Sequence, residues 1–155
     1  MTIQDDQPLH TSPGLFIAQR LRPGEDLLDA LRALLRQADA HAMALVSCAG
    51  SLTRVWIRHA NCSEGTLYDG HFEITSLVGT VDRGGQHIHI TITDGNGSAK
   101  GGHLLSESAV YTTAEIVAVV LPALQFRREP CALSGYDELV IEPVEEDRGP
   151  AASPD

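Results

Sequence analysis

The sequence predicts one α+β domain, in which a mostly antiparallel sheet of about seven strands packs against one main amphipathic helix. Its length of 155 residues is an ordinary size for one domain. A stretch with helical periodicity near the N-terminus is followed by short β-prone runs separated by Gly, Asn, Asp and Pro. The composition, 43% hydrophobic and 21% charged, is typical of a compact globular chain and not of a repeat or disordered one.

Two polar segments flank the expected domain. Residues 1–13 include Pro8 and Pro13 among polar side chains, and residues 143–155 read PVEEDRGPAASPD. Segments this poor in aromatic residues and rich in charge and proline favour disorder. We therefore expect a disordered N-terminal tail over 1–13, a folded domain over 14–142 and an acidic, disordered C-terminal tail over 143–155.

The helix is expected directly after the Pro23-Gly24 pair. Five leucines repeat there with the spacing of an amphipathic helix that has one core-facing stripe: Leu27, Leu28, Leu31, Leu34 and Leu35. Glu25 and Asp26 are expected in the first turn, where the helix dipole favours negative charge.

Seven short runs after the helix are predicted as strands. They cover residues 43–50, 51–60, 71–81, 86–94, 98–105, 114–122 and 137–143. Hairpin turns are expected at Gly50-Ser51 and at Asp94–Gly97, because these residues tolerate positive φ. One helix before many strands indicates an antiparallel sheet that is covered on one face.

The balance of charge argues against a domain that binds duplex DNA by itself. The net charge is −10, and residues 7–141 hold ten basic and fourteen acidic side chains. A DNA-binding domain normally presents a basic face to the phosphates. The alternative is DNA binding through a local basic patch, in which phosphate contacts would come from Arg20, Arg22, Arg54, Arg58 or Arg127.

The cysteines and the hydropathy narrow the protein class further. Cys48, Cys62 and Cys131 are widely spaced and form no CxxC pair, so neither a disulfide framework nor a thiolate zinc site is indicated. No apolar run approaches the roughly 20 residues that span a bilayer, and the N-terminus lacks the features of a signal peptide. These observations favour a cytoplasmic protein without a membrane partner.

A histidine pair is the strongest candidate for a functional site. In the run 86–93, alternation places His87 and His89 on one face of a strand and the isoleucines on the other. Two such imidazoles can converge on one ion, and neutral histidine suits zinc and similar divalent metals. The alternative is that these are surface histidines without an ion.

A third histidine on the next run strengthens the metal hypothesis. His103 follows Gly101 and Gly102, and it would lie opposite His87 if the turn has an odd length such as Asp94–Asn96. A two-residue turn would place His103 on the wrong face. Paired glycines in a strand often mark a bulge or a close approach of another backbone.

Several segments in order resemble the plants-and-prokaryotes-conserved (PPC) domain family. They are RPGEDLLDAL, AGSLTRVWI, GHFEITSLVGTV, HIHITITDGNGSAKGGHLL and AEIVAVV, and together they span roughly Leu15 to Val140. The resemblance implies a stand-alone prokaryotic member with an α+β fold, assembled as a homotrimer. It also implies a metal site on His87, His89 and His103. Plant members add an AT-hook for A·T-rich DNA, and this sequence contains no such segment.

Three functions are consistent with the histidine pattern and the family resemblance. The preferred one is a non-enzymatic, metal-binding homotrimer that recognises a small ligand, a protein partner or a regulatory DNA complex. The second is a metal-dependent hydrolase or lyase with an open three-histidine zinc site, for which Glu73 is a candidate acid or base. The third is direct DNA binding. The Arg127-Arg128 pair is a candidate for an anionic ligand or a partner carboxylate, although a solvated pair is the simpler interpretation.

Overall fold

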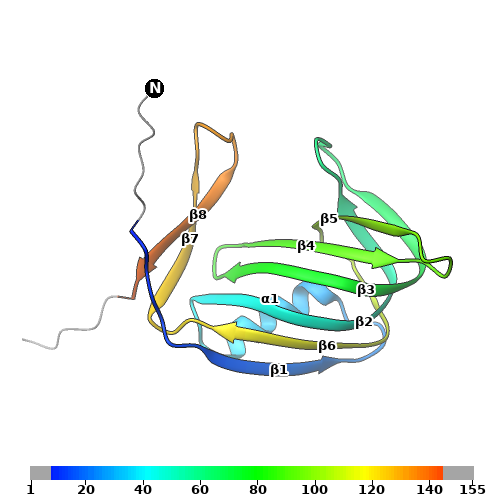
Figure 1. Ribbon diagram of the computed structural model, residues 1–155, viewed down its shortest axis with the longest axis horizontal. Coiled ribbons are helices and arrows are strands. Elements are labelled where there is room, and N and C mark those ends of the chain that lie inside the picture. Colours follow the sequence, from blue (N-terminus) through cyan, green and yellow to red (C-terminus); the bar gives the residue numbers. More distant parts are fainter. Residues whose placement is uncertain (1–7, 145–155) are drawn as a thin grey trace, which may run out of the picture.

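The computed structural model describes residues 8–144, which form eight strands and one helix (Figure 1). Most of both predicted tails, residues 1–7 and 145–155, lies outside the described residues. The elements in chain order are β1 (Leu15–Leu21), α1 (Leu27–Gln37), β2 (Ala42–Arg58), β3 (Thr66–Asp82), β4 (Gln86–Thr93), β5 (Ala99–Leu104), β6 (Val110–Val120), β7 (Leu124–Pro130) and β8 (Asp137–Pro143). The predicted α+β class with a mostly antiparallel sheet is confirmed.

Six strands form the main sheet in the order β1-β6-β2-β3-β4-β5, and every pairing is antiparallel. The end of β2 also pairs with β5, so that Ile57 lies between Thr66 of β3 and Leu104 of β5. Strands β2, β3, β4 and β5 therefore form a closed ring at this end of the sheet, because β5 pairs with both β4 and β2. The hairpin β7-β8 forms a separate two-stranded sheet that stands at one side of β4 and β5 (Figure 1).

The predicted turn at Gly50-Ser51 is wrong, because β2 runs through it without interruption. Gly50 pairs with Ile74 of β3 on one side and with Ala114 of β6 on the other, so a turn would break both ladders. A Cβ at Gly50 would lie 2.2 Å from the carbonyl oxygen of Thr113. This glycine admits the close approach of β6 rather than a change of direction.

Two strands were not among the predicted runs. β1 uses the apolar stretch before the helix and pairs along its whole length with β6. β7 contains Arg127, Arg128 and Glu129, and it pairs in full with β8. The two runs expected on either side of Gly50 are one strand, and with these two additions the described chain has eight strands instead of about seven.

Helix α1 begins at Leu27, after Glu25 and Asp26, which were expected in its first turn. Asp26 is its N-cap, and the carboxylate accepts a hydrogen bond from the Asp29 N–H at 2.8 Å. Asp29, and not Glu25 or Asp26, is therefore the acidic residue of the first turn. The five predicted leucines are all buried against the sheet. With only 11 residues, α1 is far too short to cross a membrane, and the described residues contain no other helix.

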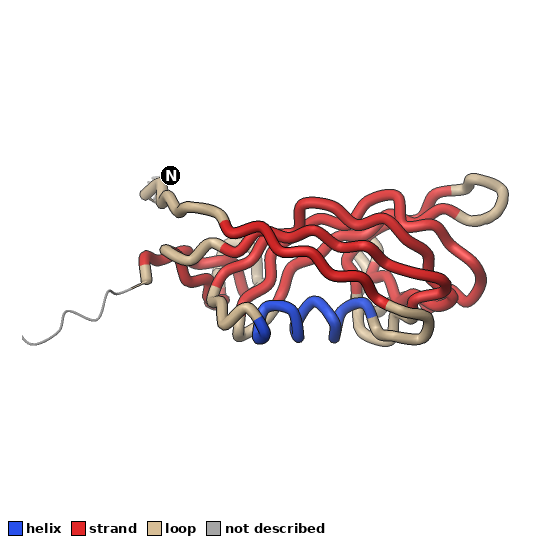
Figure 2. The backbone as a smooth tube through the Cα atoms, turned by 90° about the horizontal axis from the view of Figure 1, so that it is seen from below, coloured by secondary structure: helices blue, strands red, loops and turns tan. Residues whose placement is uncertain are grey.

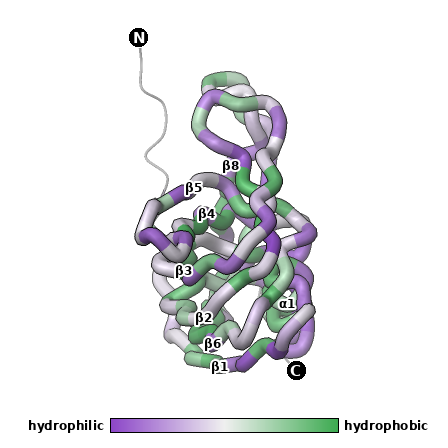
Figure 3. The backbone as a smooth tube through the Cα atoms, turned by 90° about the vertical axis from the view of Figure 1, so that its right-hand side faces the viewer, coloured by the Kyte–Doolittle hydropathy of each residue, from purple (hydrophilic) through white to green (hydrophobic). Residues whose placement is uncertain are grey.

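The helix covers one face of the main sheet and leaves the other face bare (Figure 2). On the covered side lies a single large cluster of buried leucine, isoleucine and valine side chains. Figure 3 shows apolar and polar residues interspersed along the strands. Residues on the bare face are exposed, including Phe16 (66%) on β1 and Val78 (51%) on β3. The histidine strand therefore presents one face to the core and the other to this open surface.

Candidate metal centre

Strand β4 shows the alternation that the sequence predicts. Ile88, Ile90 and Ile92 are buried in the core, whereas His87 and His89 are exposed. Burial of three isoleucines fixes the face of the strand, because a slip by one residue would expose all three of them. The apolar side of the strand thus holds both imidazoles on the bare face of the sheet.

The turn after β4 brings His103 to the same face in a register different from the expected one. His103 lies opposite His89, not opposite His87. The turn has five residues, Asp94–Ser98, and the Asp94 carboxylate accepts hydrogen bonds from the N–H groups of Asn96 and Ser98. Five is an odd length, as the common face requires, but two residues longer than the Asp94–Asn96 turn. The two additional residues shift the pairing by two positions along β4, from His87 to His89, which keeps His103 on the same face.

Gly102 places β5 close to β2. A Cβ at Gly102 would lie 2.6 Å from the carbonyl oxygen of Arg58, on the strand that pairs with β5. The glycine pair therefore marks a close approach of two backbones, one of the two alternatives that its sequence allows. This approach holds His103 beside the end of β2.

The three imidazoles converge. One ring nitrogen from each of His87, His89 and His103 lies within 4.8 Å of the other two. The Nε2 atoms of His87 and His89 are 3.2 Å apart. Two nitrogens that each bind zinc at about 2.0–2.1 Å in tetrahedral geometry are separated by roughly 3.4 Å. The donor set therefore fits a divalent metal of zinc's size and leaves a fourth position open.

The surroundings lower the pKa of two of the three histidines, His87 and His103. Burial, and after it the positive charge of Arg58, lower the pKa of His103 to about 4. Burial also lowers the pKa of His87, with smaller contributions from His89 and Arg128. A metal competes with protons for imidazole nitrogen, so histidines that stay neutral at neutral pH are ready to act as ligands.

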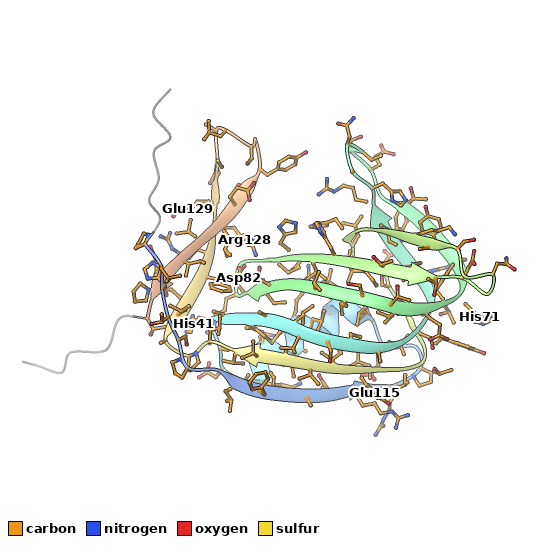
Figure 4. All side chains as sticks on the ribbon, in the orientation of Figure 1. His41, His71, Asp82, Glu115, Arg128 and Glu129 are labelled. Carbon is orange, nitrogen blue, oxygen red and sulfur yellow. The ribbon has the colours of Figure 1, made fainter. Side chains whose placement is uncertain are left out.

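A pocket of about 450 Å³ lies next to the histidines. One side is formed by His87, His103 and Arg58, and the other by residues of β7, β8 and their connection. The hairpin is fixed to the main sheet by Arg128, which donates to the buried Asp82 carboxylate at 2.9 Å and to the Thr80 hydroxyl at 2.8 Å. Figure 4 shows Arg128 and Asp82 where the hairpin meets the ends of β3 and β4.

Other predicted residues lie elsewhere or are already paired. Glu73 pairs with Thr93 at the far end of β4, roughly 15 Å along the strand from the position opposite His89. Arg127 binds Glu129 and Glu142, and Arg128 binds Asp82, so neither guanidinium is free for a ligand. Among the candidate phosphate contacts, Arg54 forms an ion pair with Asp69 at 2.8 Å.

The sequence reasoning missed Glu138 and Tyr136. Both residues line the pocket beside the histidines, and Glu138 also borders the hollow next to His89. Tyr136 and Glu138 follow the histidines by more than 30 residues; Glu138 belongs to β8, in a different sheet, and Tyr136 to the connection before it. The run 137–143 predicts a strand, but no local pattern shows which part of the molecule that strand contacts.

Comparisons with known proteins identify the relatives of this chain. The family model of the Plants and Prokaryotes Conserved (PCC) domain matches residues 11–122. The Bifunctional protein GlmU of Synechococcus sp. (strain JA-2-3B'a(2-13)) is 38% identical over 141 residues, which are 91% of this chain and 22% of that protein. The AT-hook motif nuclear-localized protein 14 of Arabidopsis thaliana is 31% identical over 126 residues, 74% of this chain and 29% of that protein. The chain thus spans less than a third of the length of these curated relatives.

Solved structures share the same fold. A hypothetical protein from Salmonella is 42% identical with a TM-score of 0.84, covering 86% of this chain and 97% of that one. A metal-containing protein from Archaeoglobus fulgidus is 23% identical with a TM-score of 0.71, covering 85% of this chain and 99% of that one. The predicted resemblance is confirmed, since the family match extends from before β1 to the end of β6: the chain belongs to the Plants and Prokaryotes Conserved domain family.

Proposed function

We propose that this chain is a metal-binding domain that assembles as a homotrimer and has a regulatory or DNA-associated binding role. The observation that carries the metal proposal is the convergence of three imidazole nitrogens within 4.8 Å on the bare face of the sheet. Zinc is the favoured metal, because three neutral imidazoles with one open position match its usual coordination. Other divalent metals of the first transition series accept the same donors.

Two further observations support the metal. The relative from Archaeoglobus fulgidus is a metal-containing protein with the same fold. In addition, burial lowers the pKa of both His87 and His103, which holds them in the ligating form. Partial desolvation of polar imidazoles costs free energy, and binding of a metal by histidines from two strands would offset that cost.

Assembly is supported by the uncovered face and edge of the sheet. Phe16 and Val78 are exposed on the face opposite α1, and β1 is an edge strand in the described chain. A wide sheet face and a free edge are commonly covered by another copy of the chain. The stoichiometry of three comes from the family resemblance.

Metal analysis of the purified protein tests the site. We expect about one equivalent of zinc or a similar ion per chain after purification without chelators. The variant H87A/H89A/H103A should lose the metal and keep its fold by circular dichroism. A matched control, H41A/H71A, removes two exposed histidines outside the cluster and should retain the metal. Native protein without any metal after exposure to zinc would contradict the proposal.

The DNA-associated role has its own test. The Arabidopsis relative is an AT-hook protein, but the described chain offers no hook and several of its arginines are paired with carboxylates. Duplex binding by this domain should be weak and should weaken further with added salt, because phosphate contacts release counterions. Binding that does not respond to salt, or no binding, would leave a regulatory role through other partners.

A metal-dependent hydrolase or lyase is the second candidate function. The pocket of about 450 Å³, lined by His87 and His103, favours it, because a metal held by the histidines would lie beside a space where a substrate fits. Glu138, on the wall of this pocket, replaces Glu73 as the candidate acid or base. Zinc-dependent turnover of ester or amide substrates that disappears in E138Q, with metal content unchanged, would support this function.

A further inference from the structure

Arg58 is an uncommitted cation in the histidine pocket. It is the last residue of β2 and lies directly opposite His103 in the β2-β5 pairing. Side chains of directly opposed residues in an antiparallel pair emerge on the same face of the sheet. Within residues 8–144, no carboxylate lies within ion-pair distance of its guanidinium, whereas Arg32, Arg54, Arg83, Lys100, Arg127 and Arg128 each have one.

Charged side chains of opposite sign line the pocket, from the main sheet and from the β7-β8 hairpin. Arg58 and the histidines form one side, and Asp137 and Glu138 of β8 lie on the other together with Tyr136. Arg128 also lines the pocket, but its guanidinium is bound to Asp82 and Thr80. The uncommitted positive charge therefore lies beside the histidines, and the carboxylates lie across from it.

We propose that this pocket binds a small ligand through an oxyanion group, a carboxylate or a phosphate, held between Arg58 and the metal on the three histidines. A hydroxyl or amino group of the same ligand faces Asp137 and Glu138. The inference rests on the metal-binding function proposed above and specifies the ligand class of that site.

The chemistry of the two cations supports an oxyanion. A guanidinium offers parallel N–H donors that match the oxygens of carboxylate and phosphate, and such charge-assisted bonds are stronger than neutral ones. A divalent metal with three imidazole ligands accepts an oxygen at its open position. Arg58 is only partly exposed, so its charge is less screened than that of a fully solvated arginine.

The size of the pocket limits the ligand. A volume of about 450 Å³ equals that of roughly 15 liquid water molecules. It accommodates a small metabolite-sized acid and excludes a folded partner or a duplex. Asp137 and Glu138 also disfavour a ligand that carries negative charge at both ends, because like charges repel.

Titration of the cobalt-loaded protein with two simple oxyanions tests this inference. Cobalt(II) reports a change of its fourth ligand through its visible absorption, and the probes are inorganic phosphate and acetate. The informative variant is R58Q. Its matched control is R54Q, on the same strand but outside the pocket and paired with Asp69. We expect at least one probe to bind the native protein and R54Q equally, and to bind R58Q about 10- to 100-fold more weakly.

The outcomes separate this inference from the function on which it rests. Failure of the native protein to take up cobalt would overturn the metal proposal and the ligand class with it. Equal cobalt content in all three proteins, with the same affinity for both probes in R58Q and native protein, would overturn the oxyanion inference alone. So would the absence of any spectral response to phosphate and acetate. A response to only one probe assigns the oxyanion to that class.

Discussion

His103 lies in a position where its proton affinity depends on the fold. It sits on β5 beside the end of β2, partly buried and next to the positive charge of Arg58. These surroundings lower its pKa from 6.5 to about 4. In the unfolded chain the imidazole regains its ordinary pKa, so the two states bind different numbers of protons between these values.

This difference predicts the pH dependence of the metal-free protein. Well above pH 6.5 the imidazole is neutral in both states, so it does not change the free energy of unfolding with pH. As the pH falls toward 4, the unfolded state takes up the proton first, so the free energy of unfolding decreases. Urea denaturation in the presence of a chelator should show this decrease, and H103Q should show a shallower one. Identical pH profiles for the two proteins would contradict the effect.

Gly79 is a second residue on which the site depends. It pairs with Ile88 of β4 at φ 148°, and a Cβ there would lie 2.0 Å from the carbonyl oxygen of His87. G79A should destabilise the fold by about 1–3 kcal/mol or more, because one of the two backbones must shift. Chemical denaturation measures the loss. G95A is the control, since nothing lies within 4 Å of its Cβ position, and a similar loss there would refute the steric explanation.

At the scale of elements, the β7-β8 hairpin is attached to the main sheet by an apolar cluster, in which Leu124 and Phe126 pack with Ala42, and by one buried ion pair. The Asp82 side chain is 0% exposed and that of Arg128 is 13% exposed. R128M would leave the buried Asp82 carboxylate without its partner, which typically costs about 3–5 kcal/mol. Thermal and urea denaturation should show this loss, and proteolysis should cut the hairpin first.

The neighbouring arginine provides the control. Arg127 also pairs with carboxylates, but these side chains are 36–50% exposed, far more than the Asp82–Arg128 pair. R127M should therefore change the free energy of unfolding by only about 0–1 kcal/mol. Equal losses in R127M and R128M would mean that burial of the Asp82–Arg128 pair does not determine the attachment of the hairpin.

Elements with a local signal could be predicted from the sequence. The alternation in β4 and the leucine stripe of α1 are visible within a few residues, so both elements and the face of His87 and His89 were predictable. Gly50 was misread because a turn and a close approach leave the same local pattern. Only its partners on β3 and β6 distinguish the two.

The remaining parts depend on contacts between distant residues. Two charged residues of β7, Arg127 and Arg128, find their carboxylate partners on β8 and β3, and its short sequence does not reveal these partners. Arg58 and His103 are 45 positions apart and meet only because β2 pairs with β5. The three candidate metal ligands could therefore be predicted from the sequence, while the walls of the pocket could not.

At the scale of the whole molecule, the bare sheet face is the surface that assembly would cover. F16E places a charge on this face, where Phe16 is 66% exposed in the described chain. If copies of the chain associate through it, light scattering with size-exclusion chromatography should show smaller species than for native protein. Q37E, at the end of α1 on the opposite side, should leave the assembly unchanged. An unchanged mass for F16E would exclude Phe16 from the interface.

The closure of β2 onto β5 has a consequence for the order of folding. Its pairs join residues 57–58 to 103–104, after the β2-β3 and β3-β4 hairpins have brought the intervening chain together. Contacts so distant in sequence form late, because the loop entropy must be overcome first. The three imidazoles come together in the local β4-β5 hairpin, but Arg58 reaches them only in chains that have finished this step. During refolding, oxyanion binding that depends on Arg58 should therefore appear later than metal uptake, which would make it a signal of completed folding.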